Sequence, residues 1–248
     1  MSRDAAMTKT ADAAGAVGTA DQRREQMLRA ALEVIADRGY ADTRIADVAE
    51  RTGISPALVI YYFKTKDRLL TEAIRYLDNL WYADGQRRMA ALPTAAARIE
   101  EIVAMTCLPE ADTEPHSSWT LWLDFWTLAA RSPEVAKLRQ KDDERWRDMI
   151  SSVVRYGQES GEFSEVDPGN FSILLCSLLD GLAIQVALED PVVDPARAFE
   201  LCMLFIAGQL GFTWKRSQAR LDGSRRAGQH NGAHQEGREP RWPVAGLS

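Results

Sequence analysis

The chain has 248 residues, 46% of them hydrophobic, which is enough apolar material for one large domain or two modest ones. Its net charge of −6 is uneven: residues 21–77 carry ten basic and nine acidic side chains, whereas residues 78–214 carry 11 and 22. A uniform charge of this sign would argue against nucleic-acid binding. The near-neutral N-terminal part, however, can gather its basic groups on one face, while the acidic middle is repelled by phosphate.

Composition also excludes several classes of protein. Cys107, Cys176 and Cys202 lack the spacing of a metal or redox site, so we expect buried free thiols in a reducing cytoplasm. The N-terminus lacks the apolar core of a signal peptide, and we expect no run long enough to span a bilayer. With three histidines and no nucleophile elbow, phosphate loop or metal-ligand set, we predict neither an enzyme nor a cofactor or metal site.

Helix signals recur along the whole chain, and strand signals are scarce. Four times, a residue that can cap a helix is followed by proline, which suits the first helical position. These pairs are Ser55-Pro56, Ser132-Pro133, Asp167-Pro168 and Asp194-Pro195, each ahead of an apolar run of helical period. The sequence therefore predicts an all-α protein of about nine helices.

The most informative stretch, residues 43–63, reads as two short helices joined at Thr52-Gly53. Glycine permits the left-handed conformation of a sharp corner. The small Ala49 lets the second helix cross the first closely, as in a helix-turn-helix unit, whose second helix enters the DNA major groove. An ordinary helical hairpin in a core is the alternative. We predict a three-helix DNA-binding head at residues 21–66.

The other elements follow in order. Residues 1–20 read as a disordered arm, and a helix at 22–38 completes the head. Residues 67–214 are predicted to form a ligand-binding and dimerisation domain. Its helices are expected at 66–91, 94–107, 118–131, 133–160, 168–189 and 195–214, with a polar loop at 109–116. Residues 215–248, rich in Gly, Arg and His, read as a disordered tail.

The head resembles the TetR family of bacterial transcriptional regulators over residues 23–70. The matching residues are Thr43, Ile45, Val48, Ala49, Gly53, Ile54, Ser55, Val59, Tyr62, Phe63, Lys66 and Leu69. Ala57 and Ile60 depart from the Gly and Tyr that many members carry. The body is similar to the branch that includes the choline-responsive repressors of betaine synthesis. That similarity rests on Trp122–Trp126, Trp146, Gly161–Phe163, Asp167-Pro168 and Asp180–Leu182.

The predicted DNA contacts fall into two groups. The residues expected to face the bases are Ser55, Pro56, Ala57, Leu58, Ile60 and Tyr61. None of them is Arg, Asn or Gln, the side chains best suited to bidentate base contacts. Direct readout would therefore come from Tyr61, from thymine-methyl contacts of Ala57 or Leu58, and from Arg44. Phosphate contacts are assigned to Thr43, Ser55, Tyr62, Lys64 and Lys66, and Arg23 would clamp a phosphate or reach the minor groove. For each charged residue alone, a solvated surface group is the alternative.

Two further sites are predicted in the body. The last two helices are too apolar for surface, so a homodimer through a four-helix bundle is expected from Leu174, Leu178, Leu182, Val186, Met203, Ile206 and Leu210. A monomer whose core uses both faces of these helices is the alternative. A ligand site for an aromatic or cationic organic compound is assigned to Trp119, Trp122, Phe125, Trp126 and Asp180, with plain core packing of the aromatic stripe as the alternative.

Together these features predict a ligand-responsive regulator, a repressor that binds a palindromic DNA operator as a dimer and is released by a small-molecule effector. Two other readings stay open. One is a DNA-binding regulator without a small-molecule ligand, and the other is a helical adaptor that binds partner proteins.

Overall fold

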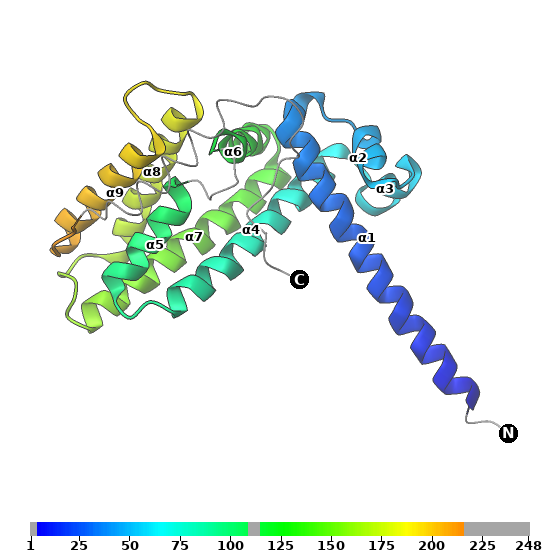
Figure 1. Cartoon of the computed structure of the whole chain (residues 1–248), viewed down its shortest axis with the longest axis horizontal. Helices are drawn as coiled ribbons and strands as arrows, with labels where there is room; N and C mark the ends of the chain where they lie inside the picture. Colours follow the sequence, from blue (N-terminus) through cyan, green and yellow to red (C-terminus); the bar gives the residue numbers. More distant parts are fainter. Residues whose placement is uncertain (1–3, 109–114, 216–248) are drawn as a thin grey trace. The chain divides into compact units, whose positions relative to one another are not determined.

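A computed structural model of the chain describes residues 4–108 and 115–215, with side chains described from residue 20 onward except at 115–118 and 120 (Figure 1). The helices are α1 Asp4–Asp42, α2 Ile45–Thr52, α3 Pro56–Phe63, α4 Lys66–Ala90, α5 Ala95–Cys107, α6 Pro115–Ala129, α7 Pro133–Glu159, α8 Pro168–Ala187 and α9 Pro195–Leu210. In these ranges the fold is entirely helical, which confirms the all-α prediction. Most of the predicted polar loop (109–114) and tail (216–248) lies outside the described residues.

All four predicted Ser-Pro and Asp-Pro starts are helix N-termini. In each, the side-chain oxygen of the capping residue accepts a hydrogen bond from the N–H three residues on, and proline occupies the first helical turn. The Asp167 and Asp194 carboxylates make the shorter bonds, of 2.6 and 2.7 Å. A carboxylate also interacts favourably with the helix dipole there, so these residues fix where α8 and α9 begin.

Helix α1 begins at Asp4 and thus includes residues that the sequence assigns to a disordered arm. The segment is rich in alanine, the residue with the highest helix propensity, which favours continuing the helix toward the N-terminus. At the other end, Gly39 has φ 75° and ψ 160°, so the regular helix stops there, as predicted.

The chain divides into two compact units, Met1–Asp78 and Asn79–Ser248, called the head and the body below. The division falls within α4, twelve residues beyond the predicted boundary at 66. The first turns of α4 belong to the head because Leu70 and Ile74 are buried in it and the Tyr76 hydroxyl donates to Glu25 of α1 at 2.6 Å.

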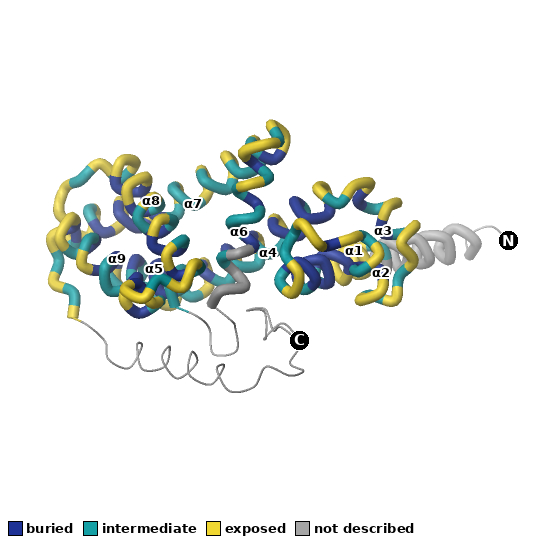
Figure 2. Tube along the Cα trace, turned by 90° about the horizontal axis from the view of Figure 1, so that it is seen from above, coloured by how far each residue is buried: buried dark blue, intermediate teal, exposed yellow. Residues whose placement is uncertain are grey.

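In the body, α5, α7, α8 and α9 enclose one hydrophobic core. Its fully buried side chains include Ile99, Ile150, Leu175, Phe199 and Met203. Along the Cα trace, buried and exposed residues alternate on α8 and α9 (Figure 2). By length and composition alone, α8 is apolar enough to cross a membrane, which the sequence analysis did not anticipate. Its contacts with α7 and α9 account for the buried part of that composition as core packing.

Candidate nucleic-acid interface and effector site

The α2–α3 pair has the geometry of a helix-turn-helix unit. Gly53 adopts φ 68°, the left-handed conformation predicted for the corner, and its N–H donates to the Glu50 carbonyl at 3.2 Å. Val48 and Ala49 of α2 and Val59 of α3 are buried. Their burial fixes the crossing of the two helices and leaves the opposite face of α3 to solvent.

That exposed face of α3 is mostly apolar. Ile60 is 46% exposed and Tyr61 is 69% exposed, and Pro56 and Ala57 are exposed beside them. Leu58 and Tyr62 are half-buried. Ser55, which caps the helix, accepts a hydrogen bond from the Leu58 N–H at 3.3 Å. The predicted reading residues therefore differ in access, and Ile60 and Tyr61 protrude furthest.

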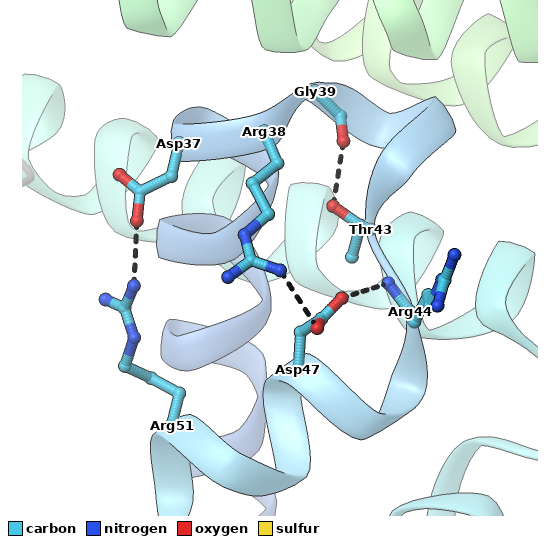
Figure 3. A network of polar contacts seen from close by, with 7 residues as sticks. All are labelled: Asp37, Arg38, Gly39, Thr43, Arg44, Asp47 and Arg51. Atoms are coloured by element: carbon cyan, nitrogen blue, oxygen red, sulfur yellow. Dashed lines mark hydrogen bonds and ion pairs between the residues drawn. The ribbon is translucent and has the colours of Figure 1, made fainter.

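Two predicted phosphate contacts have other roles. Thr43 is only 3% exposed, and its hydroxyl donates to the Gly39 carbonyl at 2.8 Å, so it closes the turn between α1 and α2 (Figure 3). The Lys66 ammonium donates to the Tyr40 and Ala41 carbonyls at 2.6 and 2.9 Å. Both carbonyls follow Gly39, so Lys66 holds the short turn that comes after the regular part of α1. Sequence spacing cannot reveal either bond.

Most arginines of the head are engaged by carboxylates. Arg24, Arg29, Arg38, Arg51 and Arg68 all form ion pairs, among them Arg38–Asp47 at 3.0 Å and Arg51–Asp37 at 2.7 Å (Figure 3). Three of the predicted DNA-binding cations, Arg23, Arg44 and Lys64, have no carboxylate partner among the described residues. The Lys64 ammonium lies 5.0 Å from the centre of the Tyr61 ring. These cations remain available to phosphate or bases.

A shallow hollow on the head is lined by Val34, Arg38, Asp47, Glu50 and Arg51. Four of its five lining residues are charged, and both arginines are already paired with carboxylates. It therefore lacks the apolar lining typical of a small-molecule site. No group of three or more potential metal ligands occurs in the part of the chain that the structure describes.

Five of the seven predicted dimer residues belong to the core of the protomer. Leu182, Val186, Met203, Ile206 and Leu210 are all buried, so they cannot also form a surface. Leu174 is 56% exposed and Leu178 is half-buried. The burial of these five was not foreseen because α8 and α9 also carry large apolar residues on the exposed side, so an apolar side chain does not tell which face is inward.

The exposed face of this hairpin nevertheless carries large apolar side chains among polar ones. Ile173 and Leu174 of α8 and Leu204 of α9 are at least half exposed. On the same face, Gly181 and Gly208 have open space where a Cβ atom would lie. A glycine inside a helix costs about 1 kcal/mol relative to alanine, and nothing within the protomer requires it at these two positions.

The aromatic residues predicted on α6 likewise divide into buried and partly exposed side chains. Phe125 is fully buried, with Leu121 and Ala129 one turn to either side, so it is a core residue. Trp119, Trp122 and Trp126 are half-buried. The Arg139 guanidinium of α7 lies 5.7 Å from the centre of the Trp126 ring, which holds a cation at that ring.

Asp180 of α8 interacts with Arg139 and with Asp143, which also lies on α7. Burial, with repulsion from Asp143, raises the pKa of Asp180 to about 6, and Arg139 partly opposes this rise. Arg139 also pairs with Asp143 at 3.4 Å. The two α7 residues thus link predicted residues Trp126 and Asp180, which sequence reasoning did not foresee because α7 reads as a charged surface helix.

A second aromatic cluster was missed. The rings of Trp81 and Tyr82 on α4 and Trp146 on α7 meet edge-on, with centroids 5.1–6.5 Å apart. The Arg145 guanidinium lies 3.8 Å from the centre of the Tyr82 ring and donates to Asn79 at 2.7 Å. Trp81-Tyr82 was an available signal, since adjacent large rings in a charged helix are uncommon on a surface.

The three cysteines are free, as predicted, but only Cys202 is buried, whereas Cys107 and Cys176 are partly buried. Burial raises the pKa of Cys176 to about 12, helped by the neighbouring Asp180 carboxylate. A contact with the Cys202 thiol, together with burial, raises the pKa of Cys107. Since the thiolate is the reactive form, these two residues are poor nucleophiles and metal ligands at neutral pH.

Known proteins resemble both units of the chain. Residues 27–73 match the model of the bacterial regulatory proteins of the tetR family, and residues 95–211 match that of the BetI-type transcriptional repressor C-terminal domain. The HTH-type transcriptional regulator BetI of Serratia proteamaculans is 31% identical over 201 residues, which cover 78% of this chain and 96% of that protein. BetI of Burkholderia cenocepacia is 29% identical over 191 residues, covering 77% and 95%.

Solved structures agree with these matches. A transcriptional regulator from Saccharomonospora viridis, in complex with choline, has a TM-score of 0.71 and 27% identity, covering 77% of this chain and 98% of that one. The regulator FadR of Bacillus subtilis, in complex with stearoyl-CoA, has a TM-score of 0.63 at 17% identity, with 73% and 96% covered, and so supports the fold alone.

Proposed function

Because this chain belongs to the TetR family of bacterial transcriptional regulators, with a BetI-type C-terminal domain, we propose that it represses transcription from a palindromic operator as a homodimer. A small organic cation would release it. A regulator of this kind acts on chromosomal DNA, so we place it in the cytoplasm. The single observation that supports DNA binding best is the helix-turn-helix unit with α3 exposed.

The head would dock with α3 in the major groove. Arg23 and Lys64, which have no carboxylate partner among the described residues, would contact phosphates, together with Ser55 and Tyr62. The body, with its 22 acidic and 11 basic side chains over residues 78–214, would be repelled by the duplex. The charge distribution thus favours approach with the head foremost.

The homodimer would form through the exposed apolar face of α8 and α9. One head makes too few contacts to be specific against a genome, whereas two heads related by a twofold axis read two half-sites about 34–36 Å apart. Ile173, Leu174 and Leu204 supply apolar area on this face. Gly181 and Gly208 would let the partner's backbone approach closely, which explains glycine at both positions.

The effector is proposed to be a small organic cation bound by aromatic rings of the body. Trp126 and Tyr82 already hold arginine guanidinium groups over their faces, so both rings lie where a cation is favourable. The carboxylates Asp143 and Asp180 lie near the first of these sites. The choline complex of the Saccharomonospora viridis regulator supports the same class of ligand.

Release would follow from a ligand that prefers a body conformation in which the two heads are wrongly spaced. A hundredfold loss of operator affinity needs about 2.7 kcal/mol of coupling, which lies within the usual range for allosteric proteins.

The test has two stages. Selection of bound duplexes from a random pool should return a palindrome, and a pool without one would refute the repressor. The selected operator is then titrated with choline, with 3,3-dimethylbutan-1-ol, its uncharged isostere, and with an acyl-CoA. We expect choline to weaken operator binding and the isostere to have little effect.

Two matched variants locate the effector. Trp126→Leu and Trp146→Leu each remove a ring while keeping an apolar side chain, one in each aromatic cluster. The variant that loses the choline response while keeping operator affinity identifies the site. If no compound changes operator affinity, the alternative of a regulator without a ligand is favoured.

A further inference from the structure

We propose that each half-site is read chiefly through thymine methyl groups contacted by Ile60 and Tyr61 of α3, and through one guanine contacted by Arg44. This inference rests on the proposed function and names the chemistry by which the operator is recognised.

The exposed face of α3 leaves few other means of reading bases. Among residues 56–63, PALVIYYF, the only polar side-chain atoms are the two tyrosine hydroxyls. Ile60, Tyr61 and Ala57 present apolar groups to solvent. In the major groove the C5 methyl of thymine is the apolar feature that distinguishes a base pair, so an apolar helix face selects it.

The polar groups near α3 are mostly committed elsewhere. Arg38 and Arg51 form ion pairs within the head, and Thr43 is buried with its hydroxyl bonded to Gly39. Lys66 donates to two carbonyls at the end of α1. None of these side chains is free to supply the bidentate contact that reads guanine or adenine.

Arg44 is the exception. Its backbone N–H donates to the Asp47 carboxylate at 2.8 Å, and Arg38 pairs with the other oxygen of that carboxylate. The start of α2 is thereby fixed while the Arg44 guanidinium points away from Asp47 (Figure 3). That guanidinium has no partner within the described residues, and Arg is the residue that reads guanine O6 and N7 most often.

Deoxyuridine in place of thymidine tests the apolar readout, because it removes only the methyl group. Each contacted thymine so replaced should weaken binding of the wild-type protein about fourfold at constant salt. The Ile60→Ala variant should bind more weakly and lose that sensitivity at one position of each half-site. Ile60 is half exposed, so the variant keeps its core. The control is Val192→Ala, which truncates an exposed apolar residue of the body and should keep the wild-type sensitivity to replacement of thymidine by deoxyuridine.

Arg44→Lys tests the second contact, since it keeps the charge and loses the planar fork. We expect a five- to 150-fold loss on the selected operator, with little loss on random DNA. The 7-deazaguanine base, which lacks the N7 acceptor, should weaken wild-type binding at one position and weaken binding of the lysine variant less.

The outcomes separate this inference from the function on which it rests. A selection without a palindrome overturns both. A palindrome whose affinity is insensitive to every uracil substitution overturns the inference alone, as does an Arg44→Lys protein that binds specific and random DNA with equally reduced affinity.

Discussion

The α2–α3 pair of the head and the α8–α9 pair of the body are both two-helix units, but they distribute apolar residues differently. In α2, the buried Val48 and Ala49 are followed by the exposed Glu50 and Arg51. In α8, buried Leu175 follows exposed Leu174, and both are leucine. Polarity marks the inner face in the first pair and does not mark it in the second.

This difference shows how to interpret a helix whose apolar residues do not mark a single face. A helix that is apolar all round is either enclosed by its own chain or covered on two sides by different partners. In this protein one side of α8 and α9 is the protomer's core, while the other carries Ile173, Leu174 and Leu204 in the open. We therefore take these exposed apolar residues as the surface of the proposed dimer.

Met203→Ala and Leu204→Ala test this comparison with the largest expected effect. Met203 is fully buried, so its truncation should cost about 2–5 kcal/mol of unfolding free energy at any protein concentration. Leu204 is 54% exposed, so its truncation should act only through the dimer and depend on concentration. Urea unfolding at two protein concentrations measures both. Equal, concentration-independent losses would mean that the two faces are alike.

Leu174→Arg combined with Leu204→Arg should break the dimer without harming the core. The added charges meet solvent in the monomer but would be buried unpaired between two copies. We expect a monomer in sedimentation and at least about a hundredfold loss of operator affinity. The control is Gln140→Arg, which adds a charge to an exposed position of α7. A double variant that remains dimeric would place the interface elsewhere.

Asp180→Asn probes the charge within the apolar hairpin. The folded pKa of about 6 lies above the ordinary 3.8, so the carboxyl stabilises the fold when it is protonated. The contribution of Asp180 to wild-type stability should therefore fall as pH rises from about 4 to about 6 and then level off. The asparagine variant should be more stable than wild type above pH 6, and this difference should vanish below pH 4. Urea unfolding midpoints across this pH range measure the difference between the two proteins. A difference that does not depend on pH would contradict the account.

Lys66→Ala and Lys64→Ala sharpen the picture of the head. Lys66 holds the turn after Gly39 through two hydrogen bonds, so its removal should cost about 1 kcal/mol of stability and leave the salt dependence of DNA binding unchanged. Lys64 has no carboxylate partner among the described residues. Its removal should therefore reduce the magnitude of the slope of log affinity against log salt by about one. A slope change for Lys66 instead would restore it as a phosphate contact.

Sequence alone placed the helices of both units because helix starts are local. A capping oxygen and a proline suffice to define the beginning of α8, and glycine with positive φ defines the corner at Gly53. Long-range choices were not accessible in the same way. The hydrogen bonds of Lys66 to Tyr40 and Ala41, and the cation–π contact of Arg139 with Trp126, join residues that no spacing rule connects.

The exposure of the predicted site residues could be foreseen in one unit and not in the other. Exposure of Ile60 and Tyr61 followed from the period of a helix with one buried stripe. The burial of Phe125 among tryptophans, and of Leu182 and Met203 among leucines, did not, since each neighbour was equally apolar.

The account depends most on two chains acting together on one operator. Sedimentation equilibrium of the protein mixed with a single selected palindromic duplex measures this directly. We predict a complex whose mass corresponds to two chains on one duplex, and a single half-site bound far more weakly. One chain on the full palindrome, with half-site and palindrome bound equally tightly, would contradict it.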